Sequence, residues 1–336
     1  MDSAYLIHRY SDLCAEADRN ADLGWRSFRE DGQKRRFPLT AEIIDRFADY
    51  IFGGIGFEVR NDFFGLMPST EGAILRRPEL SDEQRSQHLQ TLSDLFRSMW
   101  SAFNAAGVAP KTWLPLITAD NVVGGLLLTL TIDGQPLLVS SHTIRVAPRA
   151  LMMRAALKGV PSSVLEIGGG HGRFVRDVLK LAPGTRITYC DLPFNLLLAA
   201  RYLTRVFPGD VHLAWDNTPI PDTARITIVP PWRLADIPYS IDACCNFLSF
   251  QHMQADNLAF YGTALHQLGV RSIYHVNRLT PYHDGEVALD DYPFRDVYET
   301  ESRRFVASAS KSHWIDGQEH KSGSVDQIAE VLRLKQ

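Results

Sequence analysis

One short stretch constrains the fold of this chain more than any other feature. Residues 162–173 read SSVLEIGGGHGR, an apolar run that ends in three glycines. A run of this kind that leads into a helical pattern is typical of a buried strand, a tight turn and a helix in a parallel α/β sheet. Ligands of such sheets bind where the strands end, so this turn is a candidate ligand site.

The spacing of the glycines disfavours two common phosphate-binding loops. Counted from Gly168, the dinucleotide pattern GxGxxG requires glycine where Arg173 stands, and no GK[ST] follows to form a P-loop. The stretch fits ExGxGxG, with Glu166 before Gly168, Gly170 and Gly172. Alternating glycines let the backbone approach a ligand that lacks a pyrophosphate, so a dehydrogenase is disfavoured.

Asp191 is the second signal, at the end of the next strand-like run, RITYCD. An acidic side chain at that point of an α/β sheet can accept hydrogen bonds from both hydroxyls of a ribose. Structural alternatives stay open for both carboxylates. Glu166 could cap the following helix, and Asp191 could form a turn before Leu-Pro.

The second half of the chain alternates short β-rich runs with helical runs. The β-rich runs are 164–168, 186–191, 241–247 and 271–279. This alternation predicts a parallel sheet with helices on both faces. Two further short runs, 211–216 and 225–232, lie between the second and third units. One of them should supply the third strand, and the pattern does not say which.

The first part of the chain has a helical texture. Apolar residues recur at three and four positions in 41–52, 82–103 and 147–159, and Asp133-Gly134 between two β-rich runs predicts a hairpin. The length of 336 residues also favours two domains. We therefore expect a mainly helical domain with a β-hairpin at 1–140 and the ligand-binding domain at 141–336.

The amino-acid composition limits the classes of molecule that this protein is expected to bind. A net charge of −4 without a basic block argues against nucleic acid recognised through its phosphates and favours a small molecule. The four cysteines show no CxxC spacing, which suits buried reduced thiols. The N-terminus lacks the apolar core of a signal peptide, and the longest apolar run, 122–132, is too short to cross a bilayer. We expect a cytoplasmic protein without a membrane partner.

The glycine turn and Asp191 together resemble the cofactor half of the class I S-adenosylmethionine-dependent methyltransferases, over roughly residues 140–280. Four further blocks resemble the putative sugar O-methyltransferase family of bacterial biosynthetic clusters: 191–203, 226–234, 246–253 and 274–278. The resemblance implies a Rossmann-like seven-stranded sheet, S-adenosylmethionine as cofactor and methylation of a hydroxyl on a sugar or glycosylated metabolite. In the third block Asn246, Ser249 and Met253 match the family, but His252 stands where the family has Glu.

The resemblance also implies a role for each residue around the cofactor. Glu166 would lie near its amino or ribose end, and Asp191 would bind the ribose hydroxyls. The other candidates are Gly168, Gly170 and Gly172 along the methionine portion, Leu192 beside the adenine, and Asn246 and Phe247 at the end of the fourth strand. Asn246 would offer its backbone carbonyl to the cofactor ammonium. Trp232 either stacks on the adenine or packs in the core.

Methylation of a hydroxyl requires the loss of a proton, which a histidine can accept. We predict His252, just past the fourth strand, as the catalytic base; the alternative is a surface histidine at the start of a helix. His275, Asn277 and His283 are candidate substrate residues, although His275 within an apolar run is typical of a core position. The acidic residues near His283 match no metal motif, so we predict no metal site.

Two other functions stay open. The protein could methylate a nitrogen or carbon of another small metabolite, which needs no strong base. It could also bind the cofactor without transferring a methyl group, as a non-redox cyclase or a scaffold does. The N-terminal helices would cover the site or pair two subunits in a homodimer.

Overall fold

The structure is a computed structural model that describes residues 3–19, 82–118, 120, 128–132, 134–139, 141–216, 218–281, 285–315 and 318–335. The helix predicted at 41–52, the turn residue Asp133 and the candidate substrate residue His283 lie outside these ranges. Within them, no helix is long and apolar enough to cross a membrane.

A mixed sheet forms the centre of the molecule, with the strand order β5-β6-β4-β3-β7-β8-β10-β9. The strands are β3 (Ser163–Ile167), β4 (Arg186–Cys190), β5 (Val211–Leu213), β6 (Ile226–Val229), β7 (Ala243–Phe247), β8 (Ser272–Arg278), β9 (Tyr298–Ile315) and β10 (Gln318–Leu334). The first six run parallel, while β10 is antiparallel to both β8 and β9. The strand order reverses at β3, which has β4 on one side and β7 on the other, so the end of β3 is the expected ligand position.

The α/β class is confirmed, but the sheet of the described residues has eight strands where seven were expected. Both short runs that were candidates for the third strand are strands of this sheet. Residues 226–229 pair with β4 and therefore take the third place, as β6. The three residues of β5 pair only with β6 and add a short edge strand.

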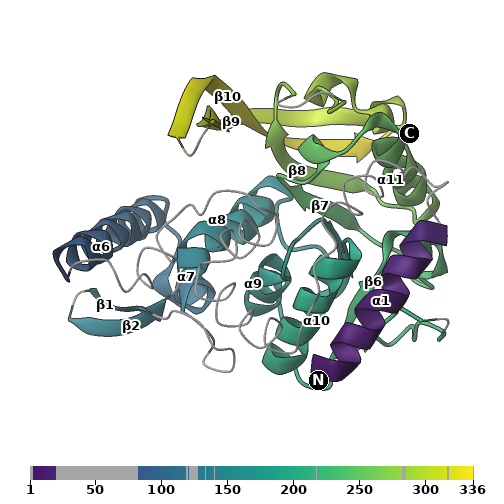
Figure 1. Cartoon of the computed structure of the whole chain (residues 1–336), viewed down its shortest axis with the longest axis horizontal. Coiled ribbons are helices and arrows are strands. Elements are labelled where there is room, and N and C mark those ends of the chain that lie inside the picture. The colour runs from purple at the N-terminus through teal and green to yellow at the C-terminus, as the bar shows by residue number, and fades with distance from the viewer. Residues whose placement is uncertain are drawn as a thin grey trace.

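Helices cover both faces of the sheet, as predicted (Figure 1). One face carries α8 (Ser141–Ala156), α9 (Arg173–Leu181) and α10 (Pro193–Val206); α11 (Ala255–Gln267) and several short 3-10 helices lie on the other. Every residue of β3, β6, β7 and β8 is buried. Strands buried on both faces read as continuous apolar runs, which is why the sequence made them easy to find.

The N-terminal part contains α6 (Asp82–Ala105), α7 (Pro110–Ile117) and a hairpin of β1 (Leu128–Ile132) and β2 (Gln135–Val139). The predicted helix at 82–103 and the hairpin are confirmed. Trp113 of α7 is fully buried and meets Trp100 of α6 edge-on, with ring centroids 4.3 Å apart. The helix expected at 147–159 begins earlier, at Ser141.

Helix α1 (Ser3–Arg19) lies away from α6 and beside α10 (Figure 1). Its buried Leu6 and Leu13 join the core on one face of the sheet. The indoles of Trp215 and Trp232, which follow β5 and β6, donate to Tyr5 and to Glu16 of α1 at 3.3 Å. The first described helix therefore packs with the later part of the chain, and the division at residue 140 stays a prediction.

Candidate functional site

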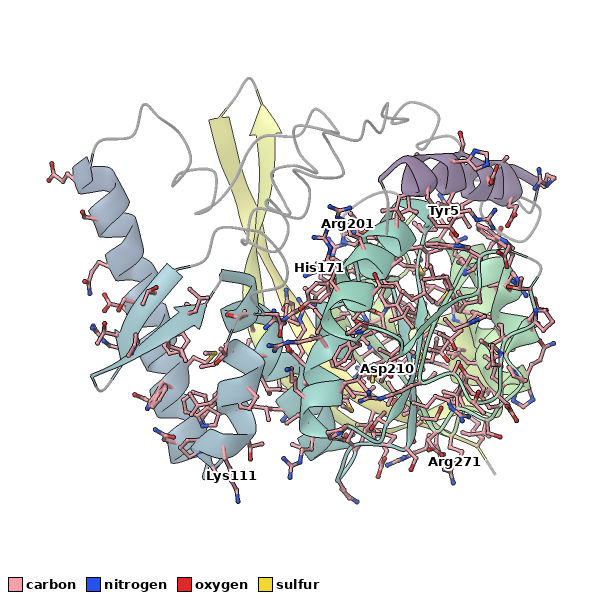
Figure 2. All side chains as sticks on the ribbon, turned by 90° about the horizontal axis from the view of Figure 1, so that it is seen from below. Tyr5, Lys111, His171, Arg201, Asp210 and Arg271 are labelled. Atoms are coloured by element: carbon pink, nitrogen blue, oxygen red, sulfur yellow. The ribbon has the colours of Figure 1, made fainter. Side chains whose placement is uncertain are left out.

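The carboxyl ends of β3, β4, β7 and β8 bring the predicted motifs to one edge of the sheet. Figure 2 shows His171 of the glycine turn on the same side of the molecule as Tyr5 of α1. Arg271, directly before β8, lies on the opposite side. The candidate site is therefore at the edge where parallel α/β sheets bind ligands.

The glycine turn requires its glycines for two different reasons. Gly168, Gly170 and Gly172 have φ angles of 71°, 71° and 83°, a left-handed conformation that disfavours any other residue. A Cβ at Gly168 would also collide with the side chain of Ser249, whereas a Cβ at Gly170 would meet no atom of the described residues within 4 Å. Gly168 is thus closed off by the protein itself, and Gly170 faces the open space that a ligand needs.

Ser249 reaches Gly168 because the chain bends sharply after β7. Leu248 has a φ of 61°, which is uncommon for a residue with a side chain and is a form of strain often found at functional sites. This bend connects the end of β7 to the turn after β3. The two strand ends are therefore packed against each other and not separated by a groove at Gly168.

Asp191 is buried and surrounded by four hydrogen-bond donors. Its Oδ2 accepts from the Gly170 N–H at 2.9 Å and lies 3.0 Å from the Tyr189 hydroxyl, and its Oδ1 accepts from the Leu192 N–H at 2.7 Å and from Asn195 Nδ2 at 2.9 Å. Tyr189 also contacts the Gly170 carbonyl, so its single proton serves two acceptors. A ribose hydroxyl that binds Asp191 must take the place of one donor. Asn195 is half-buried and can rotate without breaking the backbone.

Glu166 lies under the turn, with its carboxyl group where a Cβ of Gly169 would be. Burial raises the pKa of this carboxyl to about 8, the Asp191 carboxylate adds to the rise, and the Arg149 guanidinium opposes it. Its Oε2 has no hydrogen-bond partner among the described residues. The site therefore holds one buried polar oxygen that no described residue satisfies.

Arg173, the residue that breaks the dinucleotide pattern, anchors the N-terminal part. It donates to the Leu116 carbonyl at the end of α7 at 2.8 Å, as does Arg176 at 2.9 Å. Arg176 also pairs with Asp120 at 2.8 Å, and both arginines contact buried Asp177. This buried cluster attaches α7 to the helix that starts at the glycine turn.

Asn246 connects the glycine turn to the other half of the edge. Its Nδ2 donates to the Ile167 carbonyl at 2.8 Å, and its Oδ1 accepts from Asn277 Nδ2 at 3.0 Å. Asn277 in turn accepts from the Gln251 N–H at 3.2 Å. The chain of hydrogen bonds thus runs from the end of β3 to the residue directly before His252.

His252 lies at the carboxyl end of β7 with 55% of its side chain exposed. Its Nδ1 is 3.1 Å from Glu286 Oε1 and its Nε2 is 3.1 Å from Gln251 Nε2. The side chain of Glu286 is only 7% exposed and is paired with Arg278 at 3.0 Å. His252 is therefore a solvent-accessible imidazole held by a buried ion pair.

Two of the predicted substrate residues, His275 and Asn277, lie in the core. His275 is fully buried, with its Nε2 3.2 Å from Glu330, and burial lowers the pKa of its imidazole. Asn277 is also fully buried and acts through Gln251. The core alternative weighed for His275 matches its position, and a substrate contact stays a prediction for both residues.

Three cofactor candidates have protein partners at this edge. Trp232 donates to Glu16 and packs against the core, and half-buried Leu192 begins α10. The ring of Phe247 is 4.7 Å from that of Phe174 and lies under the Arg149 guanidinium. Their contacts with a cofactor stay predictions.

Several residues of the site had no signal in the sequence. Tyr189, Asn195, Gln251, Arg278 and Glu286 belong to it because of the fold, and only neighbours of recognised motifs could have been suspected. Within the described residues no group of three or more His, Cys, Asp or Glu side chains could hold a metal ion. Asp290 pairs with Arg303.

No protein family and no curated protein matches this chain. Among solved structures, it is similar to a SAM-dependent methyltransferase from Anabaena variabilis, with 14% identity over 73% of this chain and 95% of that one, at a TM-score of 0.39. The N-terminal domain of EvdMO1, solved with SAH bound, shows 15% identity over 62% and 90%, at a TM-score of 0.37. The methyltransferase domain of bacterial CtHen1 shows 18% identity over 55% and 97%, also at 0.37. Likenesses this distant decide neither the activity nor the substrate.

Proposed function

We propose that this protein is an S-adenosylmethionine-dependent methyltransferase that acts on a hydroxyl of a small molecule, such as a sugar or glycosylated metabolite. The observation that carries the proposal is the hydrogen bond of 2.9 Å between the Gly170 N–H and Asp191. It joins the two motifs of the resemblance into one cradle at the topological switch point of the sheet.

The residues of this cradle suit the cofactor. Gly170 has open space above it for close approach, and the Glu166 Oε2 lacks a hydrogen-bond partner among the described residues. Asp191 can accept a ribose hydroxyl when Asn195 turns aside. Glu166, Gly170, Asp191 and Leu192 would hold the cofactor, and Asn246 would hold the β3 end against β7. When bound, S-adenosylmethionine supplies an electrophilic methyl group on a sulfonium.

The second half of the edge suits an acceptor that carries a hydroxyl. His252 is exposed, and its contacts with Gln251 and Glu286 leave Nε2 as the unprotonated ring nitrogen. In the proposed reaction the substrate hydroxyl takes the place of the Gln251 NH₂ at Nε2, and Nε2 accepts the hydroxyl proton as the oxygen becomes a nucleophile. The hydrogen-bonded side chains of Asn246, Asn277 and Gln251 keep this base in register with the glycine turn, because alignment of the reacting groups is the main task of such an enzyme.

The test is detection of S-adenosylhomocysteine after incubation with S-adenosylmethionine and a panel of sugars, glycosides, amines and carbon acids. Product with hydroxyl acceptors alone supports the proposal. Product with amines or carbon acids indicates the other methyltransferase class. Binding of S-adenosylmethionine by calorimetry without product from any acceptor indicates a protein that binds the cofactor but transfers nothing. Binding of NAD but not of S-adenosylmethionine would overturn the assignment of S-adenosylmethionine as the cofactor.

A further inference from the structure

The contacts of His252 determine which of its ring nitrogens carries the proton. Gln251 Oε1 accepts from the Arg278 N–H at 2.9 Å, which identifies the other end of this side chain as the amide NH₂. That NH₂ is 3.1 Å from His252 Nε2. Because an amide NH₂ only donates, Nε2 must accept and must be unprotonated in the neutral ring.

The proton of the neutral ring is therefore on Nδ1. This nitrogen donates to Glu286 Oε1 at 3.1 Å. Arg278 Nη2 also lies 3.2 Å from Nδ1, but a guanidinium cannot donate to a protonated nitrogen. Its protons instead go to Glu286, at 3.0 Å and 3.1 Å, and to the Gln251 carbonyl at 3.3 Å.

Burial separates the two sides of this arrangement. The side chains of Glu286 and Arg278 are 7% and 9% exposed, while His252 is 55% exposed. The buried Tyr292 hydroxyl interacts electrostatically with both Arg278 and Glu286. Nδ1 is thus held by the buried ion pair, while Nε2 can receive a proton once a substrate hydroxyl has displaced the Gln251 NH₂.

We propose that Glu286 is the positioning residue of His252: it holds Nδ1–H, keeps Nε2 unprotonated and stabilises the imidazolium after proton transfer. Arg278 keeps the Glu286 carboxylate ionised and in place, and Gln251 fixes the ring from the other nitrogen. The inference rests on the proposed function for its catalytic meaning, but the tautomer itself is a property of the protein without substrate.

The kinetic test uses Glu286→Gln, which keeps the shape of the side chain and removes its charge. We expect kcat to fall about tenfold or more and the KM of the acceptor to change little. The pH of half-maximal kcat should move down, because the imidazolium loses its carboxylate while the Arg278 cation stays. The matched control is Glu299→Gln, an exposed carboxylate on β9. An unchanged kcat and pH profile in Glu286→Gln would overturn the proposal.

A second measurement needs neither a variant of Glu286 nor turnover. Long-range ¹H–¹⁵N correlation spectra of the wild-type protein report which imidazole nitrogen is protonated, and the His252 signals are assigned by their loss in His252→Asn. A proton on Nδ1 supports the proposal, and a proton on Nε2 overturns it. Failure of the methyltransferase assay with a proton on Nδ1 would reject the proposed function and leave the hydrogen-bonding role of Glu286 intact.

Discussion

The sheet edge formed by the carboxyl ends of the strands has two halves. They differ in how far their polar side chains are buried and hydrogen-bonded within the protein. On the β3–β4 side, Asp191 is buried among four donors from its own chain. On the β7–β8 side, His252 is more than half exposed above a buried ion pair. Under the proposed function, the first half is a preformed binding site for the cofactor, and the second half presents a base to the methyl acceptor. Four experiments test this contrast.

The largest effect is expected from Asp191→Ala. It leaves the Gly170 and Leu192 N–H groups without their acceptor inside the protein, so the free energy of unfolding should fall by about 3 kcal/mol. The affinity for S-adenosylmethionine should fall by about tenfold or more, because the hydrogen bond of a ribose hydroxyl to a charged group is lost. Urea unfolding and calorimetric titration measure the two effects. Asn195→Ala removes only the replaceable donor, and a loss as large as that of Asp191→Ala would contradict this description of the cradle.

His252→Ala should lower the rate of methyl transfer and leave cofactor binding unchanged. We expect kcat to fall by about 100-fold, while the affinity for S-adenosylmethionine stays within a factor of two of wild type (about 0.4 kcal/mol). Steady-state kinetics and calorimetry on the same preparation give both values. His266→Ala, at an exposed histidine of α11, is the control. A rate that stays at the wild-type level would remove His252 from the chemistry.

Gly168→Ala and Gly170→Ala form a matched pair inside the cradle. Both require a left-handed φ, at a cost of about 1 kcal/mol, but only the first also collides with Ser249. Gly168→Ala should therefore lose about 2 kcal/mol of stability or more, part of which Ser249→Gly restores. Gly170→Ala should lose about 1 kcal/mol and a larger share of its cofactor affinity. Equal stability losses for the two variants would show that Ser249 does not close off Gly168.

The remaining effect is a dependence of stability on pH. The pKa of Glu166 rises from 4.5 to about 8 on folding, so between these pH values the folded state holds a proton that the unfolded state has lost. The free energy of unfolding contributed by this group is complete below the lower value and is lost as the pH rises toward 8, by at most about 1.4 kcal/mol per pH unit. Urea unfolding across this window should show a shallower slope for Glu166→Gln. Glu299→Gln should keep the wild-type slope, and an equal change in both variants would contradict the assignment to Glu166.

The same contrast explains what sequence reasoning could reach. The glycines, Asp191 and the buried strands lie in short local patterns, because a tight turn and a two-sided core impose their own residue types. Glu286 and Arg278 gave no such pattern, since they meet His252 only after β7 and β8 pair. His275 was assigned to the substrate from its position in the chain, but its side chain is buried and turned to Glu330. The strands β9 and β10 were not predicted, since β9 carries a largely exposed row of charged and polar side chains.

The anchoring of α7 and α1 has a consequence for the order in which the chain assembles. The Leu116 carbonyl of α7 accepts hydrogen bonds from Arg173 and Arg176, which follow it in the chain. Arg9 of α1 contacts the carbonyl of Trp215, 206 residues further along. Both early helices therefore lack their binding partners while the ribosome is still making the central strands. Helices α1 and α7 are therefore secured only after the strands and helices that they contact have been synthesised.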